Sequence, residues 1–348
     1  MTDAKPENLS LTYKKFGLKG LLSKVDLLSK ENFLLKLILD IDKKHFVAVK
    51  FLKDLVNIEK DVSVYGTRKQ AEKLIKKLKI DTVVYSDITN KDFQKQGGLL
   101  IYGVNHNAFI EPVILFSLLK QKRIKLMLYR MYCFWGKNIR RLSLPVSARN
   151  YPNDKISRIR KLYDLSQGFR KSENLTDLQL IKMNEKSIIS AAKLLEGRGT
   201  VVIFPGGGGS ELNKWRFGIS RIILTIDKNK RKDISLLPVY FSGMGLKRIL
   251  LRVYRVYKER RQNNLRVGVY FGTERSISDV YSLLGNKISE KSILEYLRKD
   301  AFSQYGLKEF PLKVYLYPKN YPLALSRSLT FLMKLFIQII PFRDFFRS

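Results

Sequence analysis

The chain has 348 residues and 45% hydrophobic content, enough to bury a sizeable core in one elaborated domain or, as we favour, in one domain with an added helical bundle. Its single cysteine, Cys133, excludes a disulfide framework and is consistent with a reducing compartment, and one cysteine with two histidines is too few for a structural zinc site. The 66 Lys and Arg against 31 Asp and Glu give a formal net charge of +35, which calls for an anionic partner unless the chain tolerates strong self-repulsion.

Nucleic acid and an anionic membrane are the two partner classes that this charge favours. The basic residues are scattered along the whole chain, with no zinc-finger spacing and no ribonucleoprotein aromatic signature. An anionic bilayer attracts each Lys or Arg near its surface by about 1 kcal/mol. We therefore expect anionic membrane lipids as partners and no nucleic acid. Residues 1–8 lack the apolar core of a signal peptide, so we expect the cytoplasmic face of the membrane.

Residues 1–80 are expected to form an N-terminal helical region. Apolar residues recur at helical spacing through residues 18–59, most densely at 33–41 and 46–58. Residues 67–70, Thr-Arg-Lys-Gln, have the form of a capping box that opens a helix. The apolar face of that helix consists of Ala71, Leu74, Ile75 and Leu78. Such a bundle could shape a substrate groove, dock on the membrane, or be a plain helical cap.

Strands and helices alternate after residue 80, which predicts an α/β fold with a mainly parallel central sheet flanked by helices over residues 81–320. A helix expected at 184–196 would end at Gly197. The polar and basic stretch 150–177 is the expected mobile insertion and a candidate lid. The expected strands are residues 83–85, 99–104, 125–128, 144–148, 200–204, 236–241 and 267–271.

One of the two histidines, His106, is followed five positions later by Glu111. An imidazole titrates near neutrality and can take a proton from an attacking hydroxyl if a carboxylate holds its other nitrogen. The run 99–104 is typical of a buried strand, and Pro112 suits the first turn of a helix continuing through 113–119. His106 and Glu111 are therefore a candidate catalytic dyad at a strand-to-helix crossing. The alternative is a pair without a catalytic role, in which the histidine is hydrogen-bonded to a backbone carbonyl and the helix dipole favours the glutamate.

A glycine-rich loop follows the strand expected at 200–204. Its glycines, Gly206, Gly207, Gly208 and Gly209, expose backbone N–H groups without side-chain obstruction, which suits close approach to a phosphate or an oxyanion. The loop lacks the Gly-Lys-Ser/Thr ending of a P-loop and the last glycine of the dinucleotide fingerprint, so a nucleotide site is disfavoured. A flexible turn is the simpler alternative.

Residues 321–348 are expected to form a C-terminal membrane-interfacial amphipathic helix. Their apolar segment, 329–340, is interrupted by two polar residues and ended by Pro341, so it falls short of the roughly 20 apolar residues that a membrane span needs. Three arginines flank it: Arg327, Arg343 and Arg347. A helix lying in the membrane interface fits this pattern, and a helix docked on the core is the alternative.

Four short blocks resemble those of the glycerophospholipid acyltransferase superfamily, which includes the 1-acylglycerol-3-phosphate and lysophospholipid acyltransferases. The blocks are Asn105-His106 with Glu111-Pro112, then Val146-Ser147-Ala148-Arg149, then Phe204-Pro205-Gly206-Gly207 with Ser210 and Phe217-Gly218, then Leu237-Pro238-Val239. The resemblance spans roughly residues 80–275 and rests on the order and spacing of the blocks, which makes it more specific than any one of them. It implies a glycerol-3-phosphate acyltransferase-like fold.

The resemblance also implies a reaction, the transfer of an acyl group from acyl-CoA or acyl carrier protein to a hydroxyl, without a metal or other cofactor. By this analogy His106 is the base and Glu111 orients it. Arg149 matches the arginine that contacts the acceptor phosphate. The other expected substrate-binding residues are Asn105 and the third-block positions Gly206, Gly207, Gly208, Gly209 and Ser210.

Three departures from the family pattern leave the acceptor open. Glu111 stands where the family usually has Asp. The late lipid A acyltransferases, a related branch, also have Glu at this position. Gly206 and Gly209 replace a Glu and an Arg that help typical members hold a phosphorylated acceptor. The Pro-Gly-Gly run ending in Glu211 is similar to an element of the diacylglycerol acyltransferase branch.

We therefore expect a membrane-associated O-acyltransferase acting on a glycerolipid or lysophospholipid, in phospholipid biosynthesis or remodelling. The first alternative keeps the chemistry and changes the acceptor to a neutral one, such as diacylglycerol or a fatty alcohol, or to a lipid A-like sugar. The second alternative is a non-catalytic basic protein that binds membranes or nucleic acid.

Overall fold

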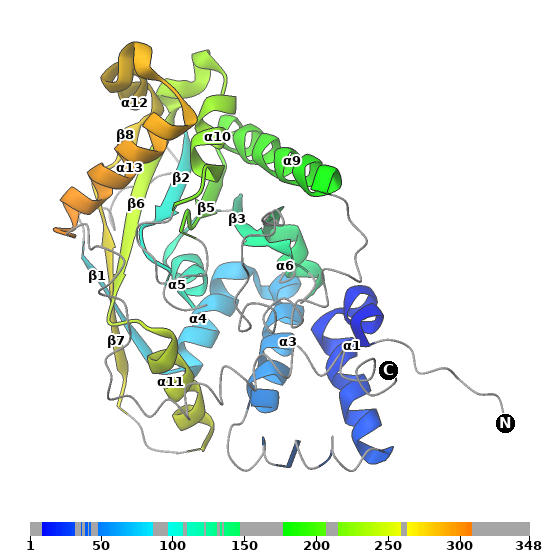
Figure 1. Cartoon of the computed structure of the whole chain (residues 1–348). Coiled ribbons are helices and arrows are strands. Elements are labelled where there is room, and N and C mark those ends of the chain that lie inside the picture. The colour runs from blue at the N-terminus through cyan, green and yellow to red at the C-terminus, as the bar shows by residue number, and fades with distance from the viewer. Residues whose placement is uncertain are drawn as a thin grey trace, which may run out of the picture.

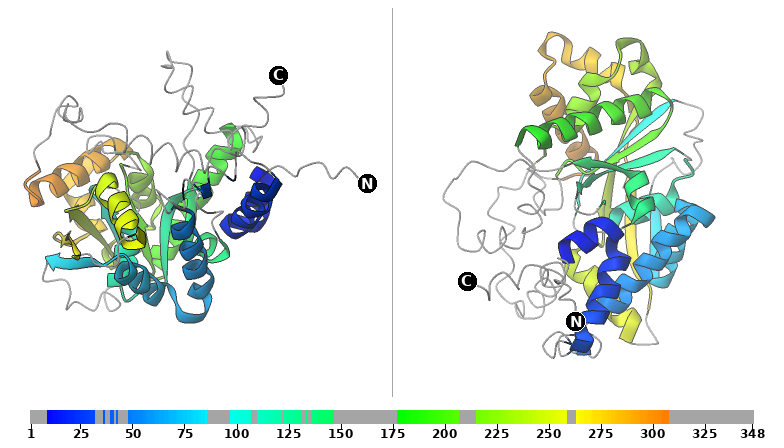
Figure 2. Two further views of the ribbon diagram at one scale, coloured as in Figure 1. Left: turned by 90° about the horizontal axis from the view of Figure 1, so that it is seen from below. Right: turned by 90° about the vertical axis from the view of Figure 1, so that its right-hand side faces the viewer.

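A sheet covered by helices on both faces forms the centre of the chain, and further helices from the N-terminal part lie beside it (Figure 1). The computed structural model describes residues 9–31, 36, 39–40, 42, 48–85, 97–106, 110–121, 123–130, 133, 136–146, 177–206, 215–258 and 263–307. Two further views place the N-terminal helix at the far end of the molecule from the helices of residues 277–304 (Figure 2).

The sheet is mainly parallel, as predicted. Within the described residues its strands are β1 (Ile80–Tyr85), β2 (Gly98–Gly103), β3 (Ile124–Tyr129), β4 (Ser143–Val146), β5 (Thr200–Ile203), β6 (Ile234–Ser242), β7 (Leu265–Phe271) and β8 (Arg275–Ser276). They are ordered β1-β7-β6-β2-β5-β3-β4, with β8 paired to β6. Antiparallel pairing joins β6 to β7 and to β8, and the other neighbours are parallel.

Helices cover both faces of the sheet and create two apolar cores. One face packs against α9 (Asp177–Glu196), α10 (Gly218–Thr225), α12 (Ile277–Leu284) and α13 (Glu290–Gln304), and the other against α3 (Ala48–Tyr65), α4 (Thr67–Lys77), α5 (Glu111–Leu118) and α11 (Leu246–Lys258). Strand β2 contributes side chains to both cores, because successive side chains of a strand point to opposite faces of the sheet. Leu100 and Tyr102 enter the first core, and Leu99 and Ile101 the second. Burial on both faces explains the unbroken apolar run of this strand.

The N-terminal helices are held to the α/β part by polar contacts as well as by packing. Helix α1 (Leu9–Glu31) is interrupted at Gly17, where φ is +67°, and its Asp26 carboxylate lies 2.8 Å from the Lys53 ammonium on α3. Glu59, also on α3, accepts a hydrogen bond of 2.6 Å from the backbone N–H of Asn138, near the start of α6 (Lys137–Leu142). The division of the chain at residues 80 and 320 stays a prediction.

Each of the seven predicted strands overlaps a strand of the structure. The helix expected at 184–196 begins earlier, at Asp177, and Pro112 lies in the first turn of α5 as predicted. Two short 3₁₀ helices, η5 (Lys228–Asp233) and η6 (Gly285–Lys287), complete the connections.

The capping box predicted at residues 67–70 is wrong. Thr67 is the first residue of α4 and not its cap, and the N-cap is Gly66, with no side-chain hydrogen bond. The reason is that α3 continues to Tyr65, so a single glycine with φ of +82° makes the whole turn between the two helices. The predicted apolar face of α4 is confirmed, because Ala71, Leu74, Ile75 and Leu78 are buried.

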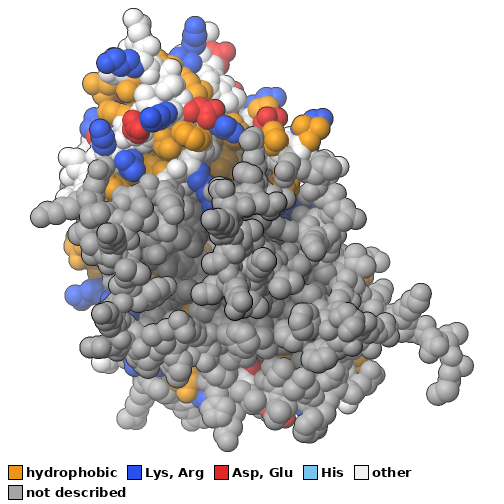
Figure 3. Space-filling model, viewed as in Figure 1, with side chains coloured by type: hydrophobic (Ala, Val, Ile, Leu, Met, Phe, Trp, Pro, Cys, Tyr) orange, Lys and Arg blue, Asp and Glu red, His pale blue; other side chains and the backbone are white. Residues whose placement is uncertain are grey.

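Several predicted features lie outside the described residues. They are residues 1–8, all but the last residue of the insertion at 150–177, and the C-terminal helix at 321–348. Among the residues that the structure does describe, no helix has both the length and the apolar character to cross a bilayer. In the upper part of Figure 3, Lys and Arg side chains are interspersed with hydrophobic ones and with a few acidic ones.

Candidate active site

The carboxyl ends of β2 and β5 bring two of the predicted motifs to one edge of the sheet. The strands are adjacent and parallel, with Leu99 opposite Thr200, so Asn105-His106 and Phe204-Pro205-Gly206 leave the sheet side by side. After β2 the chain moves to β3 on one side, and after β5 it moves to β6 on the other. Such a switch point at the carboxyl ends of strands is where open α/β sheets bind ligands.

His106 and Glu111 are in contact. Nδ1 of His106 lies 3.2 Å from Oε2 of Glu111, and the exposed fractions of the two side chains are 20% and 0%. The two atoms are close without being aligned as a good hydrogen bond. Because Nδ1 is buried against the carboxylate, Nε2 is the ring nitrogen that remains for a substrate.

The backbone explains why Glu111 can hold its position. It is the first residue of α5, and Pro112 follows it in the first turn, where the missing N–H of proline is not needed. The positive end of the helix dipole favours a carboxylate at this position. Glu111 therefore lies at the helix start, where the dipole favours it, and from there it also reaches the imidazole.

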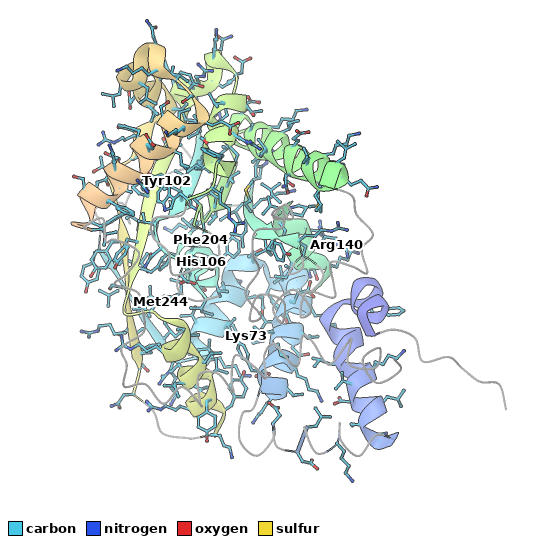
Figure 4. The ribbon with its side chains drawn as sticks, in the orientation of Figure 1. Lys73, Tyr102, His106, Arg140, Phe204 and Met244 are labelled. Atoms are coloured by element: carbon cyan, nitrogen blue, oxygen red, sulfur yellow. The ribbon has the colours of Figure 1, made fainter. Side chains whose placement is uncertain are left out.

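Phe204 supports the other side of the imidazole. The centroids of the His106 and Phe204 rings are 4.5 Å apart, with an angle of 30° between the ring planes, and Figure 4 shows the two side chains next to each other. Phe204 follows β5 directly and reaches across to the end of β2, over Gly103. The imidazole is thus held between a carboxylate and an aromatic ring, which restricts its rotation.

Substituting Gly103 with alanine should destabilise the protein by roughly 1–3 kcal/mol, the usual cost of overpacking. A Cβ at this position would lie 2.2 Å from Cδ1 and from Cε1 of Phe204, so the ring would have to leave its place beside His106. The matched control is Gly245→Ala, because no atom lies within 4 Å of a Cβ added there. Urea unfolding of both variants measures the difference, and equal stability would mean that the ring of Phe204 is not held against Gly103.

Asn105 is hydrogen-bonded to the backbone of the neighbouring strand β6. Its amide donates to the Phe241 carbonyl at 2.7 Å and accepts from the Phe241 N–H at 2.9 Å, and only 4% of the residue is exposed. These two bonds continue the pairing of β2 with β6 past the point where the ladder ends. Asn105 therefore fixes the exit of the chain just before His106, a positioning role that differs from the substrate contact implied by the resemblance.

The ends of the glycine-rich loop are fastened beside β5. The backbone N–H of Arg216 donates to the Pro205 carbonyl at 3.0 Å, so the chain returns close to the point where it left the strand. Gly206 is described and follows Pro205. The remaining predicted substrate residues, Arg149, Gly207, Gly208, Gly209 and Ser210, lie outside the described residues.

Phe204 and Gly103 are the site residues whose roles the sequence did not predict. In the sequence Phe204 is part of a block, and nothing local shows that its ring would face His106, which is 98 positions away. The one usable signal is that each follows or ends a buried strand. Within the described part of the chain, no three His, Cys, Asp or Glu side chains are grouped so as to hold a metal ion.

No protein-family model matches this chain, and no curated protein matches it. Among solved structures, it is similar to the 1-acyl-sn-glycerophosphate (LPA) acyltransferase PlsC from Thermotoga maritima, with 12% sequence identity, a TM-score of 0.32, and coverage of 81% of this chain and 98% of that chain. The likeness is too distant to carry an argument about activity, so a function for this chain has to rest on the chemistry of its own residues.

Proposed function

We propose that this chain is an O-acyltransferase in which His106 is the general base and Glu111 orients it. The observation that carries the proposal is the contact of 3.2 Å between the imidazole and the buried carboxylate, at the carboxyl end of β2. A histidine with one nitrogen on a carboxylate and the other toward the substrate is the arrangement that activates a hydroxyl.

The chemistry follows from that arrangement. Nε2 takes the proton of the acceptor hydroxyl while the oxygen of that hydroxyl attacks the thioester carbonyl carbon of acyl-CoA or acyl carrier protein. The resulting tetrahedral intermediate carries its negative charge on the former carbonyl oxygen, and backbone N–H groups of the loop that begins at Gly206 are candidate donors to it. The C–S bond then breaks, and the imidazolium returns its proton to the departing thiolate. Glu111 balances the positive charge of the imidazolium between these two steps.

The direct test offers the purified chain a labelled acyl thioester together with a panel of hydroxyl acceptors. We expect an acylated glycerolipid or lysophospholipid as product, with release of free thiol in equal amount. Thin-layer separation of the labelled products identifies the acceptor class. Absence of both thiol release and labelled product with every acceptor would favour the non-catalytic alternative, a basic protein that binds membranes or nucleic acid.

The acceptor class can be tested further through Arg149, which the resemblance places at the acceptor phosphate. If the acceptor is phosphorylated, Arg149→Ala should raise its apparent KM strongly and leave the KM of the acyl donor nearly unchanged, because an arginine fork binds phosphate through paired hydrogen bonds. Arg149→Lys should restore only part of the loss. If Arg149→Ala left the KM of the acceptor unchanged and the chain acylated diacylglycerol or a fatty alcohol, the alternative of a neutral acceptor would be favoured.

We further propose that the chain acts at the surface of an anionic membrane, on the cytoplasmic face. The support is the net charge of +35 and the arginine-flanked apolar segment at 329–340. The protein should sediment with vesicles that contain anionic lipid and not with neutral ones, and salt should weaken this binding because the Debye length is about 8 Å at 0.15 M. Removing the residues after Tyr321 should reduce the part of the binding that resists salt. A protein that stays in the supernatant at low salt but binds single-stranded RNA would contradict the proposal.

A further inference from the structure

A basic cavity lies at the opposite end of the sheet from His106. It has a volume of about 710 Å³ and is lined by Val62, Ser63, Thr67, Arg123, Ile124, Lys125, Asn138, Arg141, Leu142, Ser190, Lys193 and Leu194. Ile124 is the first residue of β3 and pairs with Thr200, the first residue of β5, which places the cavity at the amino ends of these strands. His106 follows the carboxyl end of β2, and six residues of strand span about 20 Å. The cavity is therefore separate from the candidate active site.

The charges that line this cavity are all positive. Four of its twelve lining residues are basic, Arg123, Lys125, Arg141 and Lys193, and none is acidic. Within the described part of the chain, Lys125, Arg141 and Lys193 form no ion pair, and the Nη1 group of Arg123 donates to the Gly197 carbonyl at 2.7 Å. Cations gathered around one space repel each other, and a bound anion would remove that repulsion.

The polar groups of the cavity are also suited to an anion. Thr67 brings a hydroxyl group and is the first residue of α4, whereas the hydroxyls of Ser63 and Ser190 donate to the Lys60 and Lys186 carbonyls of their own helices. The N-cap of α4 is a glycine without a side chain, so no side chain caps the first amides of this helix. The nearby helix α6 differs, because Glu59 accepts from its Asn138 N–H. Together with the lining cations, the uncapped start of α4 adds N–H donors and the positive end of a helix dipole.

The apolar part of the lining indicates that the ligand is more than an inorganic ion. Val62, Ile124, Leu142 and Leu194 contribute to the wall, and the volume lies within the range of cavities that hold small organic molecules. From this combination we infer that the cavity binds a ligand that carries a phosphate group on an organic body. Its source is either a soluble phosphorylated metabolite or the headgroup of a phospholipid. The inference does not depend on the proposed acyl transfer, which involves the other end of the sheet.

The test compares two double variants with equal loss of charge. Arg141→Gln with Lys193→Gln removes two cations of the cavity, one from α6 and one from α9. Lys137→Gln with Lys186→Gln removes two cations from the same helices outside the cavity, and both are exposed. All four side chains are at the surface, so both double variants should keep the melting temperature of the wild type. Arg140, labelled on α6 in Figure 4, is the neighbour of the substituted Arg141.

Two probes distinguish the sources of the phosphate. Inorganic pyrophosphate, titrated in a calorimeter, should bind the wild type and the control variant alike and the cavity variant at least about tenfold more weakly, because charge-assisted hydrogen bonds are lost. A soluble ligand is then indicated. If pyrophosphate binds none of them but vesicles of phosphatidylcholine with phosphatidic acid retain the cavity variant less than the control variant, the ligand is a lipid headgroup. Equal behaviour of the two variants with both probes would overturn the inference.

Discussion

Replacing His106 with alanine should lower the rate of acyl transfer by about 10² to 10⁴-fold, the usual contribution of a general base. The side chain is partly exposed and is not part of an apolar core, so the fold should survive the change. Steady-state rates of thiol release, with unfolding monitored in parallel, measure both effects. The loss should fall on kcat, because the proton is transferred during the chemical step and not during binding.

The other histidine of the chain offers a matched control. His45→Ala makes the same substitution outside the described residues and should leave the rate near that of the wild type. If purified His106→Ala turned over substrate as fast as His45→Ala, the assignment of the base would be wrong.

Glu111→Gln should be nearly as damaging as the loss of His106, while Glu111→Asp should keep measurable activity. Glutamine preserves the shape of the side chain and removes the charge that balances the imidazolium, at a site where no part of the carboxylate is exposed. Aspartate keeps the charge and shortens the side chain by one methylene, and it is the residue usual in the family that the blocks resemble. The ratio of kcat between the two variants measures the contribution of the charge.

A control separates this role from a simple effect of the helix dipole. Glu290 is also the first residue of a helix, α13, and it forms an exposed ion pair of 2.9 Å with Arg221. Glu290→Gln should cost at most about 1 kcal/mol of stability and leave kcat unchanged. If Glu111→Gln lost only as much stability as Glu290→Gln and kept the kcat of the wild type, Glu111 would stabilise the start of α5 without orienting His106.

The strands were largely predictable because their signal is local. A strand covered on both faces must be apolar along its whole length, and β2 and β5 show this as uninterrupted runs bounded by glycine or proline. The alternation with helices then implied a parallel sheet. The order of the strands was not predictable, since it depends on which faces of distant segments pack together. The antiparallel pairing of β7 with β6 is one example.

The start of α4 shows the reverse case, in which a local signal was misleading. Thr67 and Gln70 have the spacing of a capping box, but the preceding helix extends to Tyr65 and leaves only Gly66 for the turn. How far one helix runs toward the next is decided by the packing of both, and the sequence around residues 67–70 does not contain that information. Gln70 itself is buried.

For the candidate site, the contact between His106 and Glu111 could be expected from the sequence, because a histidine five positions before a glutamate at the start of a helix is a local pattern. Their surroundings were not. The ring of Phe204 against His106, the absence of a side chain at Gly103 that allows it, and the two bonds from Asn105 to Phe241 all join different strands. Contacts of this kind arise when strands far apart in the chain become neighbours in the sheet, so they follow from the strand order and from no single segment. The composition likewise established a strongly basic chain, while folding brought Arg123, Lys125, Arg141 and Lys193 together around one cavity.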